Sequence, residues 1–149
     1  AAAENIRLSV DWLDEDGRKI DPGMVSQAST IYGHFKVSKT ASVSQVREVA
    51  LVQILPSGWE IENMRLSGDE LPTWTSSWKL NREDYLDIRD DRIMWFFNLG
   101  SQPLDFVVKV NVVTQGVFYM PPATVEAMYN HRYNALVPGG KVRVVGMTK

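Results

Sequence analysis

The chain has 149 residues, a hydrophobic fraction of 44% and a formal net charge of -2, which suits one domain with a sizeable core and argues against disorder. Its 16 Lys and Arg residues are scattered, so the basic patch that nucleic-acid binding requires is missing. There are no cysteines and no apolar run of membrane-spanning length, which excludes a disulfide framework, a cysteine nucleophile and a transmembrane helix within this chain and predicts no direct membrane contact.

Apolar and polar residues alternate along most of the chain, which is typical of half-buried strands and unlike the period of an amphipathic helix. The first run places Ile6, Leu8, Val10 and Trp12 on one face, and the "DEDG" at 14–17 then supplies turn chemistry. Further inward faces are predicted, in chain order, at Ile31, Gly33, Phe35 and Val37; Ala50, Val52 and Ile54; Ile93, Trp95, Phe97 and Leu99; Phe106, Val108, Val110 and Val112; Phe118 and Met120; and Val142 and Val144. Turn signals rich in Pro and Gly separate these runs. We therefore predict an all-β fold, an antiparallel β-sandwich of seven to nine strands with at most one short helical segment, forming a single domain over residues 1–149.

The segment "DELPTWTSSWKLNREDY", residues 69–85, has no sustained period and is expected to be a loop with one helical turn. Three tryptophans are expected on inward phases of strands, where large aromatics fill a sandwich core: Trp12, Trp59 and Trp95. The candidate surface aromatics are Trp74, Trp78, Tyr119, Tyr129 and Tyr133. Because sugars stack on aromatic rings, an independent module that binds glycans or a protein receptor through residues 71–85 is an alternative function.

Two charged clusters and two histidines are candidate chemical sites. "DIRDDR", residues 87–92, could supply a general acid and base or calcium ligands, but alternation along a strand and neighbouring arginines favour exposed ion pairs. The Gly and Glu spacing of an EF-hand loop is missing after Asp14. His34 and His131 are about a hundred residues apart and are expected at the surface. No catalytic residue, metal ligand or cofactor site is therefore predicted.

The stretch "GVFYMPPATVEAMYN", residues 116–130, contains a double proline. Pro121 and Pro122 cannot donate backbone hydrogen bonds, so the preceding strand must end or lie at a sheet edge. Proline also favours the first position of a helix, so Ala123–Met128 is predicted to form one short helical turn with Tyr129 just beyond it. From local chemistry, Met128 and Tyr129 either cap the core of this domain or are displayed to something outside it.

Several segments together resemble a known family. They are "VALVQILPSGWEIEN" (49–63), "DIRDDRIMWFFNL" (87–99), "LDFVVKVNVVTQGVFYMPPATVEAMYN" (104–130) and the tail "GKVRV" (140–144). These segments resemble the C-terminal macroglobulin-like domain of bacterial α2-macroglobulins. The resemblance implies a non-catalytic terminal domain of a very large periplasmic protein that traps and so inhibits endopeptidases, anchored to the inner membrane as a lipoprotein at its other end.

The resemblance also implies a site. In members of the family that carry a reactive thioester in another domain, the Met-Tyr pair shields that bond, and the matching residues here are Met128 and Tyr129. In members that lack the thioester, the resemblance implies an ordinary interdomain contact at these residues. The loop that frames this interdomain lock contains Pro121, Pro122, Glu126 and Asn130. The family often continues with an Asp-Pro or Val-Pro pair, whereas this chain has Asn130 and His131. The implied partners are the other domains of the parent protein, the proteases trapped by the whole molecule and other envelope proteins.

Overall fold

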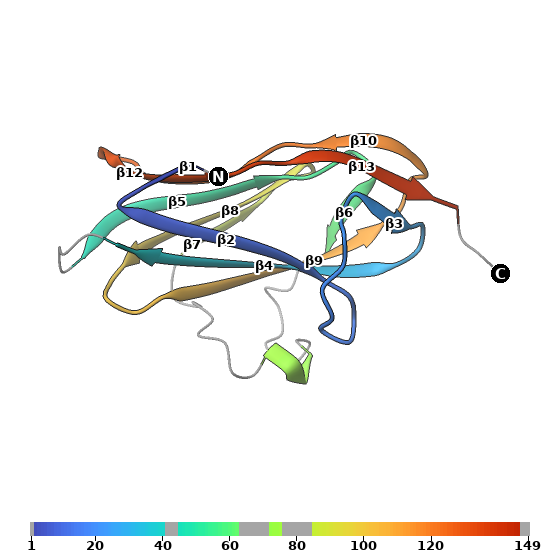
Figure 1. Cartoon of the computed structure of the whole chain (residues 1–149), viewed down its shortest axis with the longest axis horizontal. Coiled ribbons are helices and arrows are strands. Elements are labelled where there is room, and N and C mark those ends of the chain that lie inside the picture. Colours follow the sequence, from blue (N-terminus) through green and yellow to red (C-terminus); the bar gives the residue numbers. More distant parts are fainter. Residues whose placement is uncertain (1, 41–44, 63–71, 76–84, 147–149) are drawn as a thin grey trace.

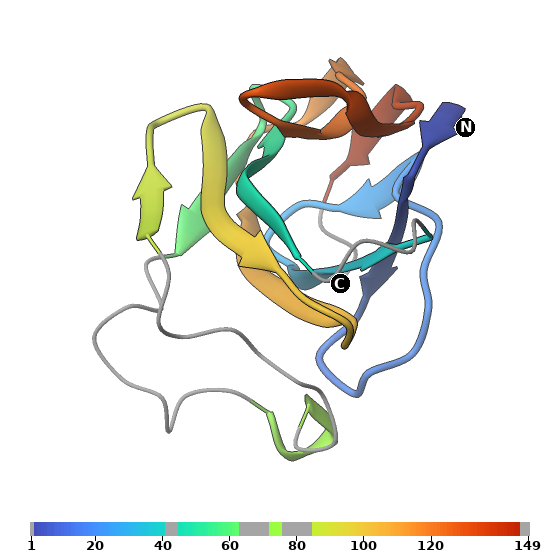
Figure 2. The ribbon, with the colours of Figure 1, turned by 90° about the vertical axis from the view of Figure 1, so that its left-hand side faces the viewer.

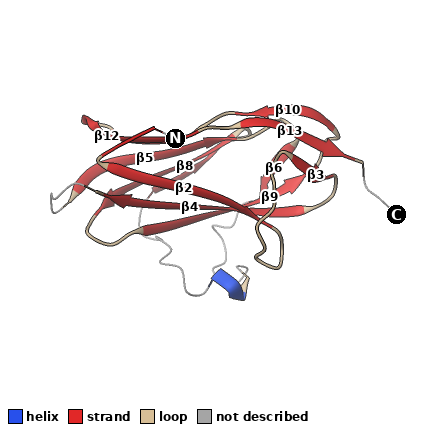
Figure 3. Cartoon of the chain, in the orientation of Figure 1, coloured by secondary structure: helices blue, strands red, loops and turns tan. Residues whose placement is uncertain are grey.

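The computed structural model describes residues 2–40, 45–62, 72–75 and 85–146. These residues form strands almost throughout, together with one 3-10 turn, η2 (Thr73–Thr75), as Figures 1 and 3 show. The strands are β1 (Ala2–Glu4), β2 (Ile6–Leu13), β3 (Met24–Ser26), β4 (Thr30–Lys39), β5 (Val46–Ile54), β6 (Trp59–Glu62), β7 (Tyr85–Ile88), β8 (Arg92–Leu99), β9 (Leu104–Val112), β10 (Gly116–Met120), β11 (Ala123–Ala127), β12 (Asn130–Val137) and β13 (Gly140–Val145). Among the described residues, no helix is long and apolar enough to cross a membrane.

The strands form three sheets, and the predicted β-sandwich is confirmed. A six-stranded sheet in the order β1-β12-β11-β5-β8-β7 faces a four-stranded sheet in the order β2-β4-β9-β6 (Figure 2). A three-stranded sheet, β10-β13-β3, covers one end of the sandwich (Figure 1). The pairing of β13 with β3 is parallel, and the other pairings among the described strands are antiparallel.

The core lies between the two larger sheets. Aromatic rings meet across it: Trp95 of β8 lies 5.2 Å from Phe35 of β4 and 5.4 Å from Phe106 of β9, measured between ring centroids. These rings belong to the inward faces predicted from alternation, and the faces of β2, β4, β8 and β9 are confirmed by burial. Val10 of β2 is the exception in degree, because it packs against the core but is only partly buried. The three tryptophans expected in the core are buried as well: Trp12, Trp59 and Trp95.

The inward phase predicted for β5 is wrong. Val49, Leu51 and Gln53 are buried, and the residues between them are partly exposed. Gln53 is only 2% exposed, and its side-chain amide donates hydrogen bonds to the carbonyls of Ile54 (2.7 Å) and Pro121 (3.1 Å). A polar side chain can be buried when it has hydrogen-bond partners. Reasoning from the sequence alone, however, assigns a polar residue to the exposed face of a strand, and this reversed the phase predicted for β5.

The thirteen described strands exceed the seven to nine predicted from the sequence. Three of the additional strands are short: β1 and β3 have three residues each and β7 has four. So few residues cannot establish a period of two, and they become strands because a neighbouring strand pairs with them.

The helical turn predicted after the double proline is also wrong, because Ala123–Ala127 is strand β11. It pairs with β5 on one side and β12 on the other, and it alternates buried and exposed residues. The two prolines mark a bend at which the chain passes from the three-stranded sheet to the six-stranded sheet. The segment that joins β12 to β13 passes between the same two sheets at Pro138–Gly139. The chain therefore changes sheets twice at one place, from β10 to β11 and from β12 to β13.

Candidate functional site

Met128 and Tyr129 form the two-residue turn between β11 and β12. Ala127 pairs with Asn130, which closes the hairpin around these two residues. Figure 1 shows this hairpin, in orange and red, projecting at the end of the sandwich opposite the C-terminus. Met128 is 40% exposed and Tyr129 is 84% exposed, whereas Val125, on the preceding strand, is buried. The two side chains are therefore displayed to the outside, at the tip of a hairpin and not at the end of a helical turn.

The turn is held on one side by a bulge in β5. The Met128 backbone N–H donates a hydrogen bond of 2.8 Å to the carbonyl of Glu48. Glu48 has a positive φ of 55° at a register shift of β5, and its own N–H donates to the Asn98 side-chain oxygen at 3.0 Å. Bulges re-aim a backbone locally, and this one aims a carbonyl at the turn.

On its other side the turn continues into an irregular segment of β12 that is fixed by asparagines. The Asn130 side-chain oxygen accepts the Arg132 N–H at 3.1 Å. The Asn134 amide donates to the carbonyl of His131 at 2.6 Å, and the Asn5 amide donates to the carbonyl of Arg132 at 2.7 Å. These side-chain hydrogen bonds fix the backbone of residues 130–132 beside the turn.

The four residues expected to frame the turn separate into two pairs. Asn130 and Glu126 lie beside it, and the Glu126 carboxylate is 3.5 Å from the ring of His131. Both of these side chains are more than half exposed, so their interaction is weak. Pro121 and Pro122 lie at the far end of β11, where the Pro121 carbonyl is bound by Gln53.

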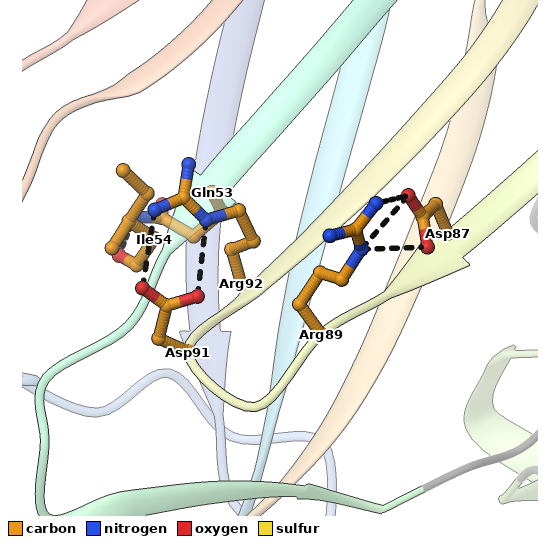
Figure 4. Close-up of polar contacts among 6 residues, drawn as sticks. All are labelled: Gln53, Ile54, Asp87, Arg89, Asp91 and Arg92. Carbon is orange, nitrogen blue, oxygen red and sulfur yellow. Dashed lines mark hydrogen bonds and ion pairs between the residues drawn. The ribbon is translucent and has the colours of Figure 1, made fainter.

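The acidic cluster at 87–92 forms two separate ion pairs, as Figure 4 shows. Arg89 lies 3.2 Å from the Asp87 carboxylate, and Arg92 lies 3.0 Å from that of Asp91. The hydrogen bond from Arg92 lowers the pKa of Asp91 below its ordinary value, so this carboxyl stays ionised at neutral pH. The predicted ion pairs are therefore present, and the pair of Arg92 with Asp91 is exposed as expected, whereas the Asp87 side chain is only 21% exposed.

The expectation that both histidines lie at the surface is correct for His131 and wrong for His34. The His34 side chain is 14% exposed, and its Nε2 lies 2.7 Å from a carboxylate oxygen of Asp105. His34 alternates with the core residues Gly33 and Phe35 and so faces away from the sandwich core, yet it is mostly covered and paired with Asp105. Among the described residues, no group of three or more His, Asp or Glu residues is placed to hold a metal ion.

Trp74 is not a free aromatic platform. Its ring packs edge-on against Tyr32, with centroids 5.3 Å apart, and its Nε1 donates to the Glu15 carbonyl at 2.9 Å. Burial raises the pKa of the Tyr32 phenol above its ordinary value of 10.0. Trp74 thus packs on the outer face of β4. It is therefore not available as a stacking platform in the hypothesis of a glycan-binding surface at residues 71–85. Trp78 lies outside the described residues.

Residues 6–131 match the family model described as the Bacterial Alpha-2-macroglobulin MG10 domain. The chain belongs to this family. The MG10 domain described here is 27% identical to the alpha-2-macroglobulin homolog of Yersinia pestis over 97% of this chain, and 31% identical to the alpha-2-macroglobulin of Xylella fastidiosa (strain Temecula1 / ATCC 700964) over 79%. It spans 8% of the length of each of these relatives.

Solved structures share the fold of this MG10 domain. Salmonella alpha-2-macroglobulin reacted with methylamine superposes with a TM-score of 0.80 at 22% identity, over 97% of this chain and 9% of that one. Native Escherichia coli alpha-2-macroglobulin, spanning domain MG7 to the C-terminus, gives a TM-score of 0.80 at 20% identity, over 96% of this chain and 24% of that one. The chain is therefore a macroglobulin-like β-sandwich domain of a bacterial α2-macroglobulin protein.

Sequence reasoning about this MG10 domain missed the groups that hold the turn in place. Glu48 and Asn98 come from β5 and β8, and Asn5 from the junction of β1 with β2. They act through backbone carbonyls and side-chain amides from parts of the chain distant in sequence. Asn130, in contrast, bonds two residues ahead, which is a local pattern that a sequence can reveal.

Proposed function

We propose that this domain is the non-catalytic terminal domain of a periplasmic, lipid-anchored α2-macroglobulin that traps proteases, and that it docks on a neighbouring domain of that protein through Met128 and Tyr129. The observation that carries this proposal is the display of two large apolar side chains on a hydrogen-bonded two-residue turn. Such turns usually carry Asn and Gly, which suit both the backbone and water. The turn conformation does not favour Met and Tyr at these positions, so their presence is better explained by a contact with another surface.

The energy of this contact suits a reversible lock. Burying both side chains would contribute on the order of 2–4 kcal/mol before costs, since fully burying a large apolar side chain contributes about 1.5–3 kcal/mol and Met128 is already more than half covered. The turn is already fixed by its hydrogen bonds to β5 and β12, so docking loses little backbone entropy. A contact of this size holds two tethered domains together and still opens when the rest of the molecule rearranges.

We further propose that the covered group is a thioester in another domain. This chain lacks Cys and cannot form such a bond itself. Hydrolysis of a thioester requires water at its carbonyl carbon, and a thioether beside a phenol ring can exclude that water. The Salmonella relative reacts with methylamine, and an Escherichia coli relative is activated by trypsin; both reactions are expected of the parent of this chain.

The test uses the full-length parent with Met128→Ala and Tyr129→Gly combined. We expect faster incorporation of methylamine and faster appearance of a free thiol than in the wild type, because water and amines then reach the bond. Val113→Gly is the control, since Val113 is also an exposed apolar side chain, at 42%, but lies between β9 and β10, away from the turn. Tyr129→Phe should keep the wild-type rate, because the ring provides the cover.

Two outcomes would count against the proposal. Equal methylamine rates in the wild type and the double variant would show that the pair covers nothing reactive. An equal acceleration in Val113→Gly would show that any loss of an exposed apolar side chain loosens the domain, and a specific lock at the turn would then be rejected.

A further inference from the structure

Exposed apolar side chains gather at two places on this domain. Six large ones are exposed among the described residues. Two are Met128 and Tyr129 in the turn discussed above. Three others, Met24, Val117 and Tyr119, are 55–63% exposed and belong to the three-stranded sheet at the other end of the molecule (Figure 1). Exposed apolar groups that gather on one surface mark interaction sites more often than isolated ones do.

The strand register places these three side chains on one face. Val117 pairs with Arg143, and Tyr119 pairs with Lys141. Arg143 in turn pairs with Met24 in the parallel register of β13 with β3. Directly paired residues share a face of a sheet, and residues two apart along a strand do too. The outer face of the three-stranded sheet therefore carries three apolar side chains around two cations, and we call it the β10-β13-β3 face.

The charge of this face selects the kind of partner. Lys141 and Arg143 are exposed and point outward with the apolar groups. The nearby Asp21 carboxylate uses one oxygen to accept the Gly23 N–H at 2.8 Å, within its own turn. A second copy of the chain would bring cation against cation if the two faces met, which is unfavourable. An apolar surface bordered by carboxylates is complementary.

The number of cations distinguishes a protein partner from a lipid surface. Segments that bind anionic membranes typically gather about four to eight Lys or Arg residues, and this face has two. A small mixed patch is sufficient when its partner is tethered, because a linker makes the effective concentration high. The relatives are long enough to supply such a partner, since this chain spans 8% of their length.

We propose that the β10-β13-β3 face is a second docking surface, which binds an acidic-bordered apolar surface on another domain of the parent polypeptide. The inference rests on the proposed function only in that this chain is one domain of a longer protein. It does not depend on the contact made by Met128 and Tyr129, because the two surfaces lie at different ends of the molecule.

The experiment is site-specific photo-crosslinking in the full-length parent, with p-benzoylphenylalanine replacing Tyr119. We expect an intramolecular crosslink that mass spectrometry maps to one segment, next to Asp or Glu residues, in a different domain. Arg143→Glu should reduce its yield about fivefold or more, because like charges then face each other. Arg7→Glu makes the same charge change at an exposed arginine of β2 and should leave the yield unchanged.

Several results would overturn this inference. These are crosslinks between two copies, crosslinks to lipid when phosphatidylglycerol vesicles are added, crosslinks scattered over many segments, and a yield unaffected by Arg143→Glu. The same probe placed at Tyr129 separates the two proposals. A crosslink from position 129 with none from 119 rejects the second surface and leaves the proposed function standing, and the reverse pattern does the opposite.

Discussion

The bend at which two strands change sheets gives the sharpest test of this fold, through Gly139→Ala. A Cβ at Gly139 would lie 2.7 Å from the carbonyl carbons of Met120 and Pro121, and closer still to the Met120 oxygen. Ordinary carbon contacts begin near 3.4 Å, and the atoms it meets belong to backbone, which cannot rotate away. Overpacking of this kind costs about 2–3 kcal/mol. For a chain of 149 residues, this corresponds to a fall of roughly 6–9 °C in Tm.

The neighbouring glycine is the matched control. A Cβ at Gly140 would have no heavy atom within 4 Å, so Gly140→Ala should change stability by less than about 0.5 kcal/mol. Urea unfolding and thermal melts followed by circular dichroism measure both variants. The reasoning is refuted if Gly139→Ala melts within 2 °C of the wild type, a limit of about 0.6 kcal/mol, or if the two variants are equally destabilised.

Three further substitutions test single interactions by urea unfolding. Gln53→Leu removes the donor to the carbonyls of Ile54 and Pro121 and should cost about 1–3 kcal/mol. Gln102→Leu, at an exposed position, should cost less than about 0.5 kcal/mol, and equal effects would contradict the role of the buried amide. Ala28 has a φ of 69°, so Ala28→Gly should stabilise the domain by about 0.5–1 kcal/mol, and a loss of stability would mean that this strain is absent. The hydrogen bond from Lys109 lowers the pKa of Glu62 below its ordinary value of 4.5. The ionised carboxylate therefore stabilises the fold at pH values above 4.5, and this contribution is lost as the pH falls through the pKa of the folded state. Because this side chain is 37% exposed, the free energy of unfolding of the wild type should exceed that of Glu62→Gln by no more than about 1 kcal/mol at pH 7, and the difference should disappear near pH 3; a difference that grows in acid would contradict the assigned sign.

Alternation predicted the long strands well because each of them buries one face. The runs beginning at Ile6, Ile93 and Phe106 have the inward phase expected from the sequence. The pattern failed at β5, where a bulge at Glu48 and the buried amide of Gln53 interrupt it. Both features depend on groups from other strands, so they could not be found by examining residues 46–54 alone.

The segment after the double proline was misread for a related reason. Pro122 followed by Ala123 is a good start for a helix in isolation. In the fold, two strands already flank this segment, and pairing on both sides stabilises β11 against a single helical turn. The sequence did identify Met128 and Tyr129 as the pair of interest through the family resemblance. Their exposure could not be predicted, because it depends on the hairpin that only the sheet creates.

The bend also connects the two proposed contact surfaces. β10 and β13 carry the β10-β13-β3 face, while β11 and β12 carry the turn at Met128 and Tyr129, and each pair of strands runs through the bend at Pro121 and Gly139. The angle between the two surfaces is therefore set by how closely the two chain segments pack at Gly139. A side chain there must push these segments apart, since backbone atoms lie on the facing side. We expect that in the folded fraction of the full-length Gly139→Ala variant the yields of the photo-crosslinks from positions 119 and 129 decrease together. The reason is that one rigid domain with a changed bend cannot make both contacts at once. Loss of only one crosslink would mean that the surfaces dock independently and that the bend does not set their geometry.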